Sequence, residues 1–208
     1  MEITPPELEA YMEGLLAPRH PVLLEMEAEG KRRGFPMVGP MVGTMLAVLA
    51  RAIGARRVLE LGSGFGYSAF WFADALPEEG RLLAFEHDPE NVKLAEDYFA
   101  RAGLAEKADF RVGDALELIE AESGPFDIIF VDIDKHSYPQ VPAKALPRLR
   151  AGGLLITDNT LWFGRVLGEP EDDWAAGVQA YNRMVSADPG LVTVIIPLRD
   201  GVAVSLKL

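Results

Sequence analysis

Apolar and polar positions follow two different patterns along this chain. Over the first 55 residues the apolar side chains recur at helical spacing, and a second, more apolar run from Met41 to Ile53 is ended by Gly54. The first stripe consists of Leu8, Tyr11, Met12, Leu15 and Leu16. Between the two runs, Arg19-His20-Pro21 and the segment RRGFPMVGP indicate a loop. Residues 1–55 are therefore predicted to form a helical segment interrupted by that loop.

From Arg57 onward, short apolar runs alternate with longer amphipathic segments. The apolar runs are VLELG, LLAFE, DFRVG, FDIIFVD and GLLITD. The amphipathic segments between them include Pro89 to Ala102, Ala115 to Ala121 and Tyr138 to Leu149. This alternation is typical of βαβ units, which build a parallel sheet with helices on both faces. The sequence therefore predicts an α/β domain of the doubly wound type.

After Asp158 the rhythm changes again. A helix is predicted near Trp174–Val185, and the runs LVTVIIPL and VAVSLKL then flank Arg199-Asp200-Gly201. Two β-rich runs on either side of an Asp-Gly pair predict a hairpin, so the sheet is expected to end in antiparallel strands. A chain of 208 residues without internal repeats is expected to form one domain, residues 1–208.

Composition supports a folded protein in a reducing compartment. With 49% hydrophobic residues the chain can form a sizeable core, and the absence of cysteine excludes disulfides, thiolate nucleophiles and thiolate zinc sites. The acidic start lacks the pattern of a signal peptide. The longest uncharged run, Met37 to Ala50, is shorter than the roughly 18 residues that a membrane span needs. We expect a soluble, cytoplasmic protein with no membrane partner.

The charge balance disfavours broad binding to nucleic acid. The formal net charge is −12, from 20 Lys and Arg against 32 Asp and Glu, whereas phosphate backbones are bound mainly through Lys and Arg. One short basic cluster, Lys31-Arg32-Arg33, stands out. We expect this cluster to lie in a solvated loop; binding of RNA to it is the alternative.

A glycine-rich turn follows the first predicted strand. The segment ELGSGFGYS, Glu60 to Ser68, has glycines at 62, 64 and 66, which allow a sharp turn and close approach of a ligand. Its spacing, G-x-G-x-G, differs from the G-x-G-x-x-G of dinucleotide folds and disfavours an NAD-dependent oxidoreductase. One strand later, Glu86 ends LLAFE and is placed to accept both hydroxyls of a ribose. Together they predict an adenosine-containing ligand.

Charged residues gather where the next two predicted strands end. Asp132 ends one strand, and Asp158-Asn159 end the following one. If these strands are neighbours, two carboxylates and an amide oxygen converge at the carboxyl edge of the sheet and suit Mg²⁺ or Ca²⁺. Without a cation the two carboxylates would repel each other, and the pKa of one of them would rise. Helix capping by Asp132 or Asp158 is the alternative.

Other polar residues lie close to this edge in the sequence. If the strand continued, Asp132, Asp134 and His136 would share one face and could bind a metal, but His136 is more readily explained as an exposed loop residue. Lys135 is either a surface lysine or, beside a divalent metal, a base for a substrate hydroxyl. His20 and His87 are expected to be structural.

From about Met37 to its end, the chain resembles the metal- and S-adenosylmethionine-dependent O-methyltransferases of the caffeoyl-CoA and catechol type, which include bacterial members. The stretches that carry the resemblance are VLELGSGFGYS, LLAFEHDPE, FDIIFVDIDKHSY, LLITDNTLW and DGVAVSLKL. The resemblance implies a Rossmann-like class I methyltransferase fold, in which a seven-stranded, mostly parallel sheet ends in a hairpin. It also implies methyl transfer to a hydroxyl of a metal-chelated, catechol-like small molecule.

The same resemblance implies roles for individual residues. Asp132, Asp158 and Asn159 match the metal ligands, for Mg²⁺ or else Ca²⁺ or Mn²⁺, and Lys135 matches the catalytic base. The positions that match cofactor contacts are Val38, Glu60, Gly62, Ser63, Ser68, Glu86, Ala115, Asp132 and Asp134. Relatives commonly form homodimers, partly through their N-terminal helices, so residues 1–55 are expected to contribute to dimer contacts and to the substrate entrance.

The chain departs from the family pattern in places. Phe163, in LWFGRV, stands where plant members have an asparagine that contacts the substrate, which indicates a more apolar pocket. Asp134 replaces the tryptophan of the catechol type, and the first 36 residues match poorly. An alternative acceptor is a hydroxylated uridine in tRNA, for which the acidic balance is unfavourable. A binding module without turnover would require the loss of a key group, and none is missing.

Overall fold

One mixed sheet forms the centre of the protein. The computed structural model describes residues 3–208, so the first two residues of the expected helical segment lie outside the described residues. The sheet has seven strands in the order β3-β2-β1-β4-β5-β7-β6. Their bounds are β1 Arg57–Leu61, β2 Arg81–Glu86, β3 Ala108–Val112, β4 Phe126–Val131, β5 Leu149–Thr157, β6 Leu191–Ile196 and β7 Val202–Lys207. Strands β1 to β5 run parallel, and β7 is antiparallel to both β5 and β6. The predicted sheet with a C-terminal hairpin is confirmed.

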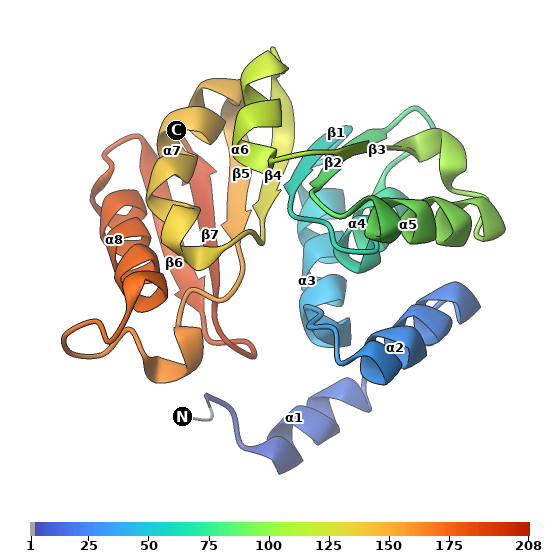
Figure 1. Ribbon diagram of the computed structural model, residues 1–208, viewed down its shortest axis with the longest axis horizontal. Coiled ribbons are helices and arrows are strands. Elements are labelled where there is room, and N and C mark those ends of the chain that lie inside the picture. Colours follow the sequence, from blue (N-terminus) through green and yellow to red (C-terminus); the bar gives the residue numbers. More distant parts are fainter. Residues whose placement is uncertain (1–2) are drawn as a thin grey trace.

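Helices cover both faces of the sheet (Figure 1). Helices α3, α4 and α5 lie on one face, and α6, α7 and α8 lie on the other. The α-helices are α1 Pro6–Glu13, α2 Pro21–Arg33, α3 Gly39–Ala52, α4 Tyr67–Ala75, α5 Pro89–Arg101, α6 Ala115–Leu118, α7 Val141–Ala145 and α8 Asp173–Ala187. Short 3-10 helices are η1 Ala105–Lys107, η2 Ile119–Ala121, η3 Lys135–Gln140, η4 Leu146–Arg148 and η5 Trp162–Gly164. No helix within residues 3–208 is both long and apolar enough to cross a membrane.

The continuous apolar runs in the sequence reflect this double covering. In β4, Ile128 and Phe130 pack into the core on the α3–α4–α5 side, whereas Ile129 and Val131 pack into the core on the opposite side. Because successive side chains of a strand point to opposite faces, a strand buried on both faces needs apolar residues at every position. The carboxyl edge of the sheet is therefore flanked by packed core on both faces.

Helix α2 occupies a segment that the sequence analysis interpreted as a loop, and that interpretation is wrong. Pro21 stands at the first helical position, where its missing N–H costs nothing, and His20 Nδ1 accepts a hydrogen bond from Val22 N–H at 3.2 Å. Val22 and Met26 form a buried stripe at helical spacing, and Gly34 ends the helix at φ 62°. Pro21 therefore begins a helix, and the basic cluster Lys31-Arg32-Arg33 forms its last turn.

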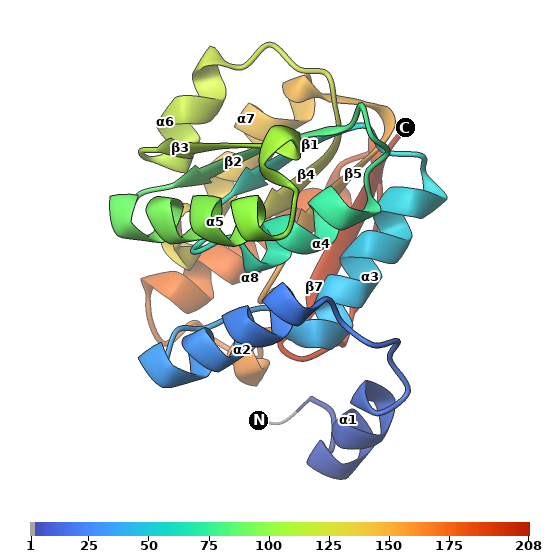
Figure 2. The ribbon, with the colours of Figure 1, turned by 90° about the vertical axis from the view of Figure 1, so that its right-hand side faces the viewer.

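The predicted helical run from Tyr138 to Leu149 is broken into shorter pieces. Pro139, Pro142 and Pro147 lie within it, and each removes a backbone donor, so the chain follows η3, α7 and η4 in turn. Figure 2 shows α2 beneath the body of the protein and α1 farther out at the periphery. Helix α1 has no buried residue.

Candidate active site

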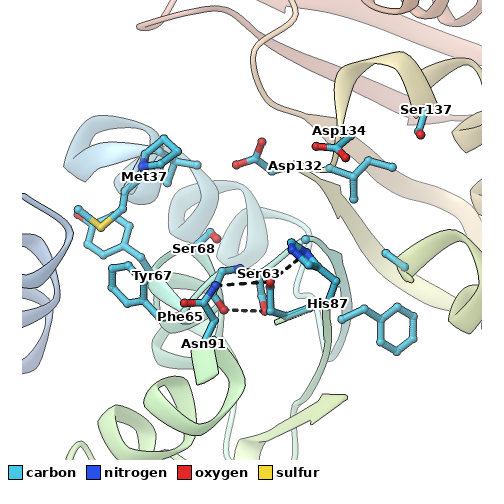
Figure 3. Close-up of a pocket in the computed structure, with 18 of the residues that line it drawn as sticks. Met37, Ser63, Phe65, Tyr67, Ser68, His87, Asn91, Asp132, Asp134 and Ser137 are labelled. Carbon is cyan, nitrogen blue, oxygen red and sulfur yellow. Dashed lines mark hydrogen bonds and ion pairs between the residues drawn. The ribbon is translucent and has the colours of Figure 1, made fainter. Parts of the chain in front are cut away.

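A cavity of about 450 Å³ opens at the carboxyl edge of the sheet, where β1, β2 and β4 end. Figure 3 shows Asp132 and Asp134 on one side of this cavity and Ser63 and Asn91 on the other. The predicted site residues that line it are Val38, Gly62, Ser63, Ser68, Glu86, Ala115, Asp132, Asp134 and Lys135. The predicted site residues outside this lining are Glu60, Asp158 and Asn159. The cavity has the size of a small-molecule site.

The glycine loop between β1 and α4 lies directly against the end of β4. Gly62 has φ 85°, and a Cβ added there would stand 2.3 Å from the carbonyl oxygen of Asp132. The N–H groups of Gly62 and Ser63 donate to the carbonyl of Phe85 at 3.0 and 3.1 Å, and Gly66 leads into α4 at φ 88°. Because only glycine tolerates this conformation and this approach, the loop and the charged end of β4 form one continuous site.

Glu86 is held under the glycine loop by several donors. Its Oε2 accepts a hydrogen bond from Gly64 N–H at 2.8 Å, and its Oε1 accepts one from Asp88 N–H at 3.0 Å. Asn91 Nδ2 lies 3.5 Å from Oε1. His87, which we expected to be structural, instead has an exposed side chain that lines the cavity, with Nδ1 3.2 Å from Glu86 Oε1. The carboxylate stands at the cavity wall, where a ribose would need it.

Glu60 lies just behind the cavity wall and is fully buried. Its Oε1 accepts a hydrogen bond from Ser68 Oγ, whereas Oε2 has no hydrogen-bond partner among the described residues. Burial raises the pKa of Glu60 to about 8, although the hydrogen bond from Ser68 acts in the opposite direction. A buried carboxyl with an unpartnered oxygen is suited to receive a cationic group, such as the ammonium of an amino acid moiety.

Residues from three further elements complete the lining. Val38 is buried at the start of α3. Ala115 is the first residue of α6, which Asp114 caps by accepting a hydrogen bond from Leu116 N–H at 2.8 Å. Asp134 precedes η3 and is exposed. The cavity wall is therefore built from segments far apart in the sequence.

Lys135 is buried against the end of β4, so the surface-lysine alternative is wrong. Its Nζ donates to Asp132 Oδ1 at 2.7 Å and to the carbonyl of Ile133 at 3.1 Å. The ammonium also lies 5.1 Å from the centroid of the Tyr138 ring. This places a primary amine at the cavity wall, in direct contact with a carboxylate.

Asp158 lies beside Asp132, as predicted. Strands β4 and β5 are neighbours, with Val131 opposite Thr157, so the next residue of each strand is an aspartate at the same edge. Asp158 is buried, its backbone carbonyl accepts a hydrogen bond from Tyr138 Oη at 2.9 Å, and its Oδ1 has no hydrogen-bond partner among the described residues. Burial raises the pKa of Asp158 to about 7, and the negative charge of Asp132 adds to the effect. The positive charges of Arg199 and Lys135 act in the opposite direction but do not cancel the effect of burial.

Strained backbone is concentrated next to these carboxylates. Within residues 3–208, the non-glycine residues with positive φ are Asn159 (56°), Trp162 (46°), Phe163 (53°) and Arg199 (50°). They lie in the loop after β5 and in the turn between β6 and β7. Strain of this kind costs roughly 1–3 kcal/mol per residue and is typical of functional sites.

Asp200 ties the turn between β6 and β7 to the loop after β5. Its backbone carbonyl accepts a hydrogen bond from Leu161 N–H at 2.9 Å, and its Oδ1 accepts one from Phe163 N–H. The residue is buried, and burial raises the pKa of its carboxyl, against the opposing effect of Phe163 N–H. Asn159, on the same loop, is among the groups that lower that pKa. The sequence analysis placed Asp200 only in a hairpin turn and missed this second contact.

The donor set at this edge fits a hard cation chemically. Asp132, Asp158 and Asn159 offer oxygen ligands, and Oδ1 of the buried Asp158 accepts no hydrogen bond from the described residues. Within residues 3–208, however, no group of three or more His, Cys, Asp or Glu side chains is arranged to hold a metal ion. A cation would compete with Lys135 for Asp132.

The alternative metal site at Asp132, Asp134 and His136 is wrong. The strand does not continue beyond Val131, because the chain turns into η3 at Lys135. His136 is exposed, and its ring lies 6.1 Å from that of Trp174. Asp132 and Asp158 also cap no helix in the described part of the chain, which leaves their pairing at the sheet edge as the better explanation.

Trp174 lines the cavity, and Phe163, which was expected there from the sequence, does not. Trp174, at the start of α8, stacks on Trp162 with centroids 5.7 Å apart. Phe163 is 56% exposed and is absent from the lining, so it does not make the cavity more apolar in this structure. The sequence analysis missed Trp174 because it lies in a helix far from any motif.

Comparison with known proteins agrees with this geometry. The model of the O-methyltransferase family matches residues 17–208. A catechol O-methyltransferase from Niastella koreensis is 35% identical, with 94% of each chain covered. Caffeoyl-CoA O-methyltransferase 1 from Eucalyptus globulus is 34% identical over 80% of this chain and 72% of its own length. The O-methyltransferase from Bacillus cereus, solved in complex with SAH, is 27% identical and superimposes with a TM-score of 0.89 over 97% of each chain.

Proposed function

Because the chain belongs to the O-methyltransferase family, we propose that it transfers the methyl group of S-adenosylmethionine to one hydroxyl of a vicinal diphenol that is chelated by a divalent cation. The observation that carries this proposal is the contact between the glycine loop and the end of β4. There Gly62 brings the cavity wall to within van der Waals distance of Asp132. The names of the catechol and caffeoyl-CoA O-methyltransferases similar to this chain support the same acceptor class.

Several residues of the cavity suit the parts of S-adenosylmethionine. When bound, this cosubstrate supplies an electrophilic methyl group on its sulfonium sulfur. Glu86 would accept hydrogen bonds from the ribose hydroxyls, and Glu60 with Ser68 would pair with the ammonium. Ala115 would lie near the adenine, and Val38 and Asp134 would complete the contacts. The Bacillus cereus relative was solved in complex with SAH, which supports S-adenosylmethionine as the methyl donor.

Asp132, Asp158 and Asn159 would hold a divalent cation, Mg²⁺ in the first place and Ca²⁺ or Mn²⁺ as alternatives. When bound, such a cation lowers the pKa of a phenol from its ordinary value of about 10. Tyr138 and Asp200 contribute by fixing the backbone that carries these ligands.

Lys135 Nζ takes the proton of the attacking hydroxyl. In this structure Nζ donates to Asp132 Oδ1 at 2.7 Å. A divalent cation held by Asp132 would take this partner away from Lys135, and the neutral amine form of Lys135 would then be the base that accepts the hydroxyl proton. Residues at the sheet edge would hold the acceptor oxygen in line with the methyl group, and such orientation can supply much of the rate.

Methylation of a vicinal diphenol with and without EDTA tests the proposal. We expect Mg²⁺-dependent activity that falls at least about 100-fold in Asp158→Asn, while SAH affinity, measured by calorimetry, stays within about twofold of wild type. Asp173→Asn, on an exposed residue at the start of α8, is the matched control and should retain full activity. Equal activity in EDTA would contradict the role of the cation. Activity on tRNA in place of diphenols would support the alternative acceptor.

A further inference from the structure

The basic cluster Lys31-Arg32-Arg33 is not one surface patch. Arg32 Nε donates to Glu29 Oε2 at 2.8 Å on the outer side of α2. Arg33 points the other way, and its Nη2 donates to Asn91 Oδ1 at 2.9 Å across to α5. Two adjacent residues of equal charge therefore serve different surfaces of the helix.

Arg33 is linked through Asn91 to the acid proposed to bind the ribose. Asn91 is buried in the first turn of α5, lines the cavity and lies with Nδ2 3.5 Å from Glu86 Oε1. Its amide thus accepts from Arg33 with its oxygen and faces Glu86 with its nitrogen. Fixing the oxygen end also fixes which way the nitrogen points, because an amide that accepts with one atom must donate with the other.

The guanidinium of Arg33 also lies beside two aromatic rings at the cavity. It stands 5.3 Å from the centroid of Phe35 and 5.5 Å from that of Phe65, within the range of cation–π contacts. The two rings pack edge to face, with centroids 5.1 Å apart. Phe65 belongs to the glycine loop, whereas Phe35 belongs to the segment that follows α2.

That segment, residues 34–38, forms a strap along one wall of the cavity. Gly34 reverses the chain at φ 62°, and Phe35 N–H donates to the carbonyl of Gly30 at 2.9 Å, which turns the strap back towards the glycine loop. A Cβ on Gly64 would stand 2.8 Å from the Phe35 ring, so the ring rests on bare backbone. The strap residues that line the cavity are Phe35, Pro36, Met37 and Val38.

We propose that Arg33 is a positioning residue for the cofactor ribose, which orients Glu86 through Asn91 and holds the strap against the glycine loop through Phe35 and Phe65. The proposal rests on the proposed function in one respect, namely that Glu86 binds the ribose of S-adenosylmethionine. Arg33 itself donates to Asn91 and not to the ligand.

Calorimetric titration with SAH compares Arg33→Gln with Arg32→Gln. The two variants change the net charge equally at adjacent positions, so any general electrostatic effect is shared. We expect Arg33→Gln to weaken SAH binding and to raise the KM for S-adenosylmethionine by about 5- to 10-fold. The KM for the diphenol and kcat should change by less than about twofold, and Arg32→Gln should match wild type in all of these values. The melting temperature of Arg33→Gln should lie within a few degrees of the wild-type value, because Arg33 is an exposed residue.

A double-mutant cycle with Asn91→Ala tests the route of the effect. If Arg33 acts through Asn91, the double variant should bind SAH no more than about twofold more weakly than Asn91→Ala alone. Arg33→Lys, which keeps the charge but loses the planar fork, should recover only part of the affinity.

The outcomes separate this proposal from the function on which it rests. Wild-type affinity for SAH in Arg33→Gln would overturn the role of Arg33, and fully additive losses in the cycle would overturn its action through Asn91. Failure of the wild-type protein to bind SAH, or unchanged binding in Glu86→Gln, would instead overturn the proposed cofactor assignment.

Discussion

The side chain of Glu60 is buried, has one carboxylate oxygen without a hydrogen-bond partner among the described residues, and has a raised pKa. With a pKa of about 8 in the folded protein, the carboxyl is mostly protonated at pH 7. An ammonium placed beside it stabilises the carboxylate and lowers that pKa, so binding releases the proton. We therefore expect SAH binding at pH 7 to release about one proton, measurable by calorimetry in buffers of different ionisation enthalpy.

The same pKa sets the direction of two pH dependences. Because the folded pKa is above the unfolded value, the stabilisation from this carboxyl is complete below about pH 4.5 and is lost as the pH rises towards about 8. SAH affinity should increase over the same range. Glu60→Gln should abolish the proton release, whereas Glu120→Gln, at an exposed carboxylate, should preserve it. Binding by the wild-type protein without proton exchange would refute the pairing of Glu60 with the ammonium.

At the scale of single residues, the position of a site residue could be predicted from the sequence where that residue lies within a contiguous motif. Asp132, Lys135 and Asp158 follow apolar runs directly, so their place at the sheet edge follows from the strands that carry them. Asn91 and Trp174 could not be found in this way, because each reaches the cavity from a helix whose local pattern shows only amphipathicity. Their role depends on how α5 and α8 pack, which no local pattern contains.

At the scale of elements, helix α8 determines where η3 lies. Gly177 faces η3, and a Cβ there would stand 2.2 Å from the carbonyl oxygen of Lys135. An added methyl group meets backbone, which cannot rotate away as a side chain can. We expect Gly177→Ala to destabilise the protein by about 1–3 kcal/mol, despite the better helix propensity of alanine.

The added methyl group of Gly177→Ala should push η3 away from α8. This shift should also affect catalysis, since η3 carries Lys135. We expect kcat of Gly177→Ala to fall at least about tenfold, by analogy with other losses of general base catalysis. SAH affinity should fall less than kcat, because most of the proposed cofactor contacts, including Glu60, Ser68 and Glu86, lie outside η3. Gly14→Ala is a suitable control, as the nearest atoms to its added Cβ are 3.4 Å away. A wild-type kcat in Gly177→Ala would show that η3 can move without cost.

Helix α2 shows which elements the sequence leaves ambiguous. Its two flanking breakers, Pro21 and Gly34, fit a loop as well as the first turn and the end of a helix, and only the buried stripe from Val22 to Met26 decides between them. The strands were easier to predict, because a run that is apolar at every position fits a sheet covered on both faces. Helices α4 and α5 were predicted from the same alternation.

At the scale of the whole molecule, the homodimer implied by the family resemblance remains a prediction. Helix α1 and the turn that follows it expose three large apolar side chains, Leu8 by 49%, Tyr11 by 65% and Leu15 by 68%, which suit contact with a second copy of the chain. We expect sedimentation equilibrium to show a dimer at micromolar concentration and Tyr11→Glu/Leu15→Glu to shift it to the monomer. SAH affinity should be retained, since α1 does not line the cavity.

Leu167→Glu provides the control for that shift. Leu167 is 67% exposed, yet it lies in the loop before α8. The variant should sediment like wild type. A wild-type protein that sediments as a monomer would contradict the dimer, and a persistent dimer in the α1 variant would assign the interface to another surface.

The position of β7 within the sheet has a consequence for how the protein is made. Although it is the last strand along the chain, β7 lies between β5 and β6. While the chain emerges from the ribosome, β6 therefore has no adjacent strand to join, and the edge of β5 stays open until residues 202–207 arrive. Asp200 and Gly201, which bind the loop after β5, arrive with the same hairpin. The acidic edge of the active site is thus the last region of the nascent chain to take shape.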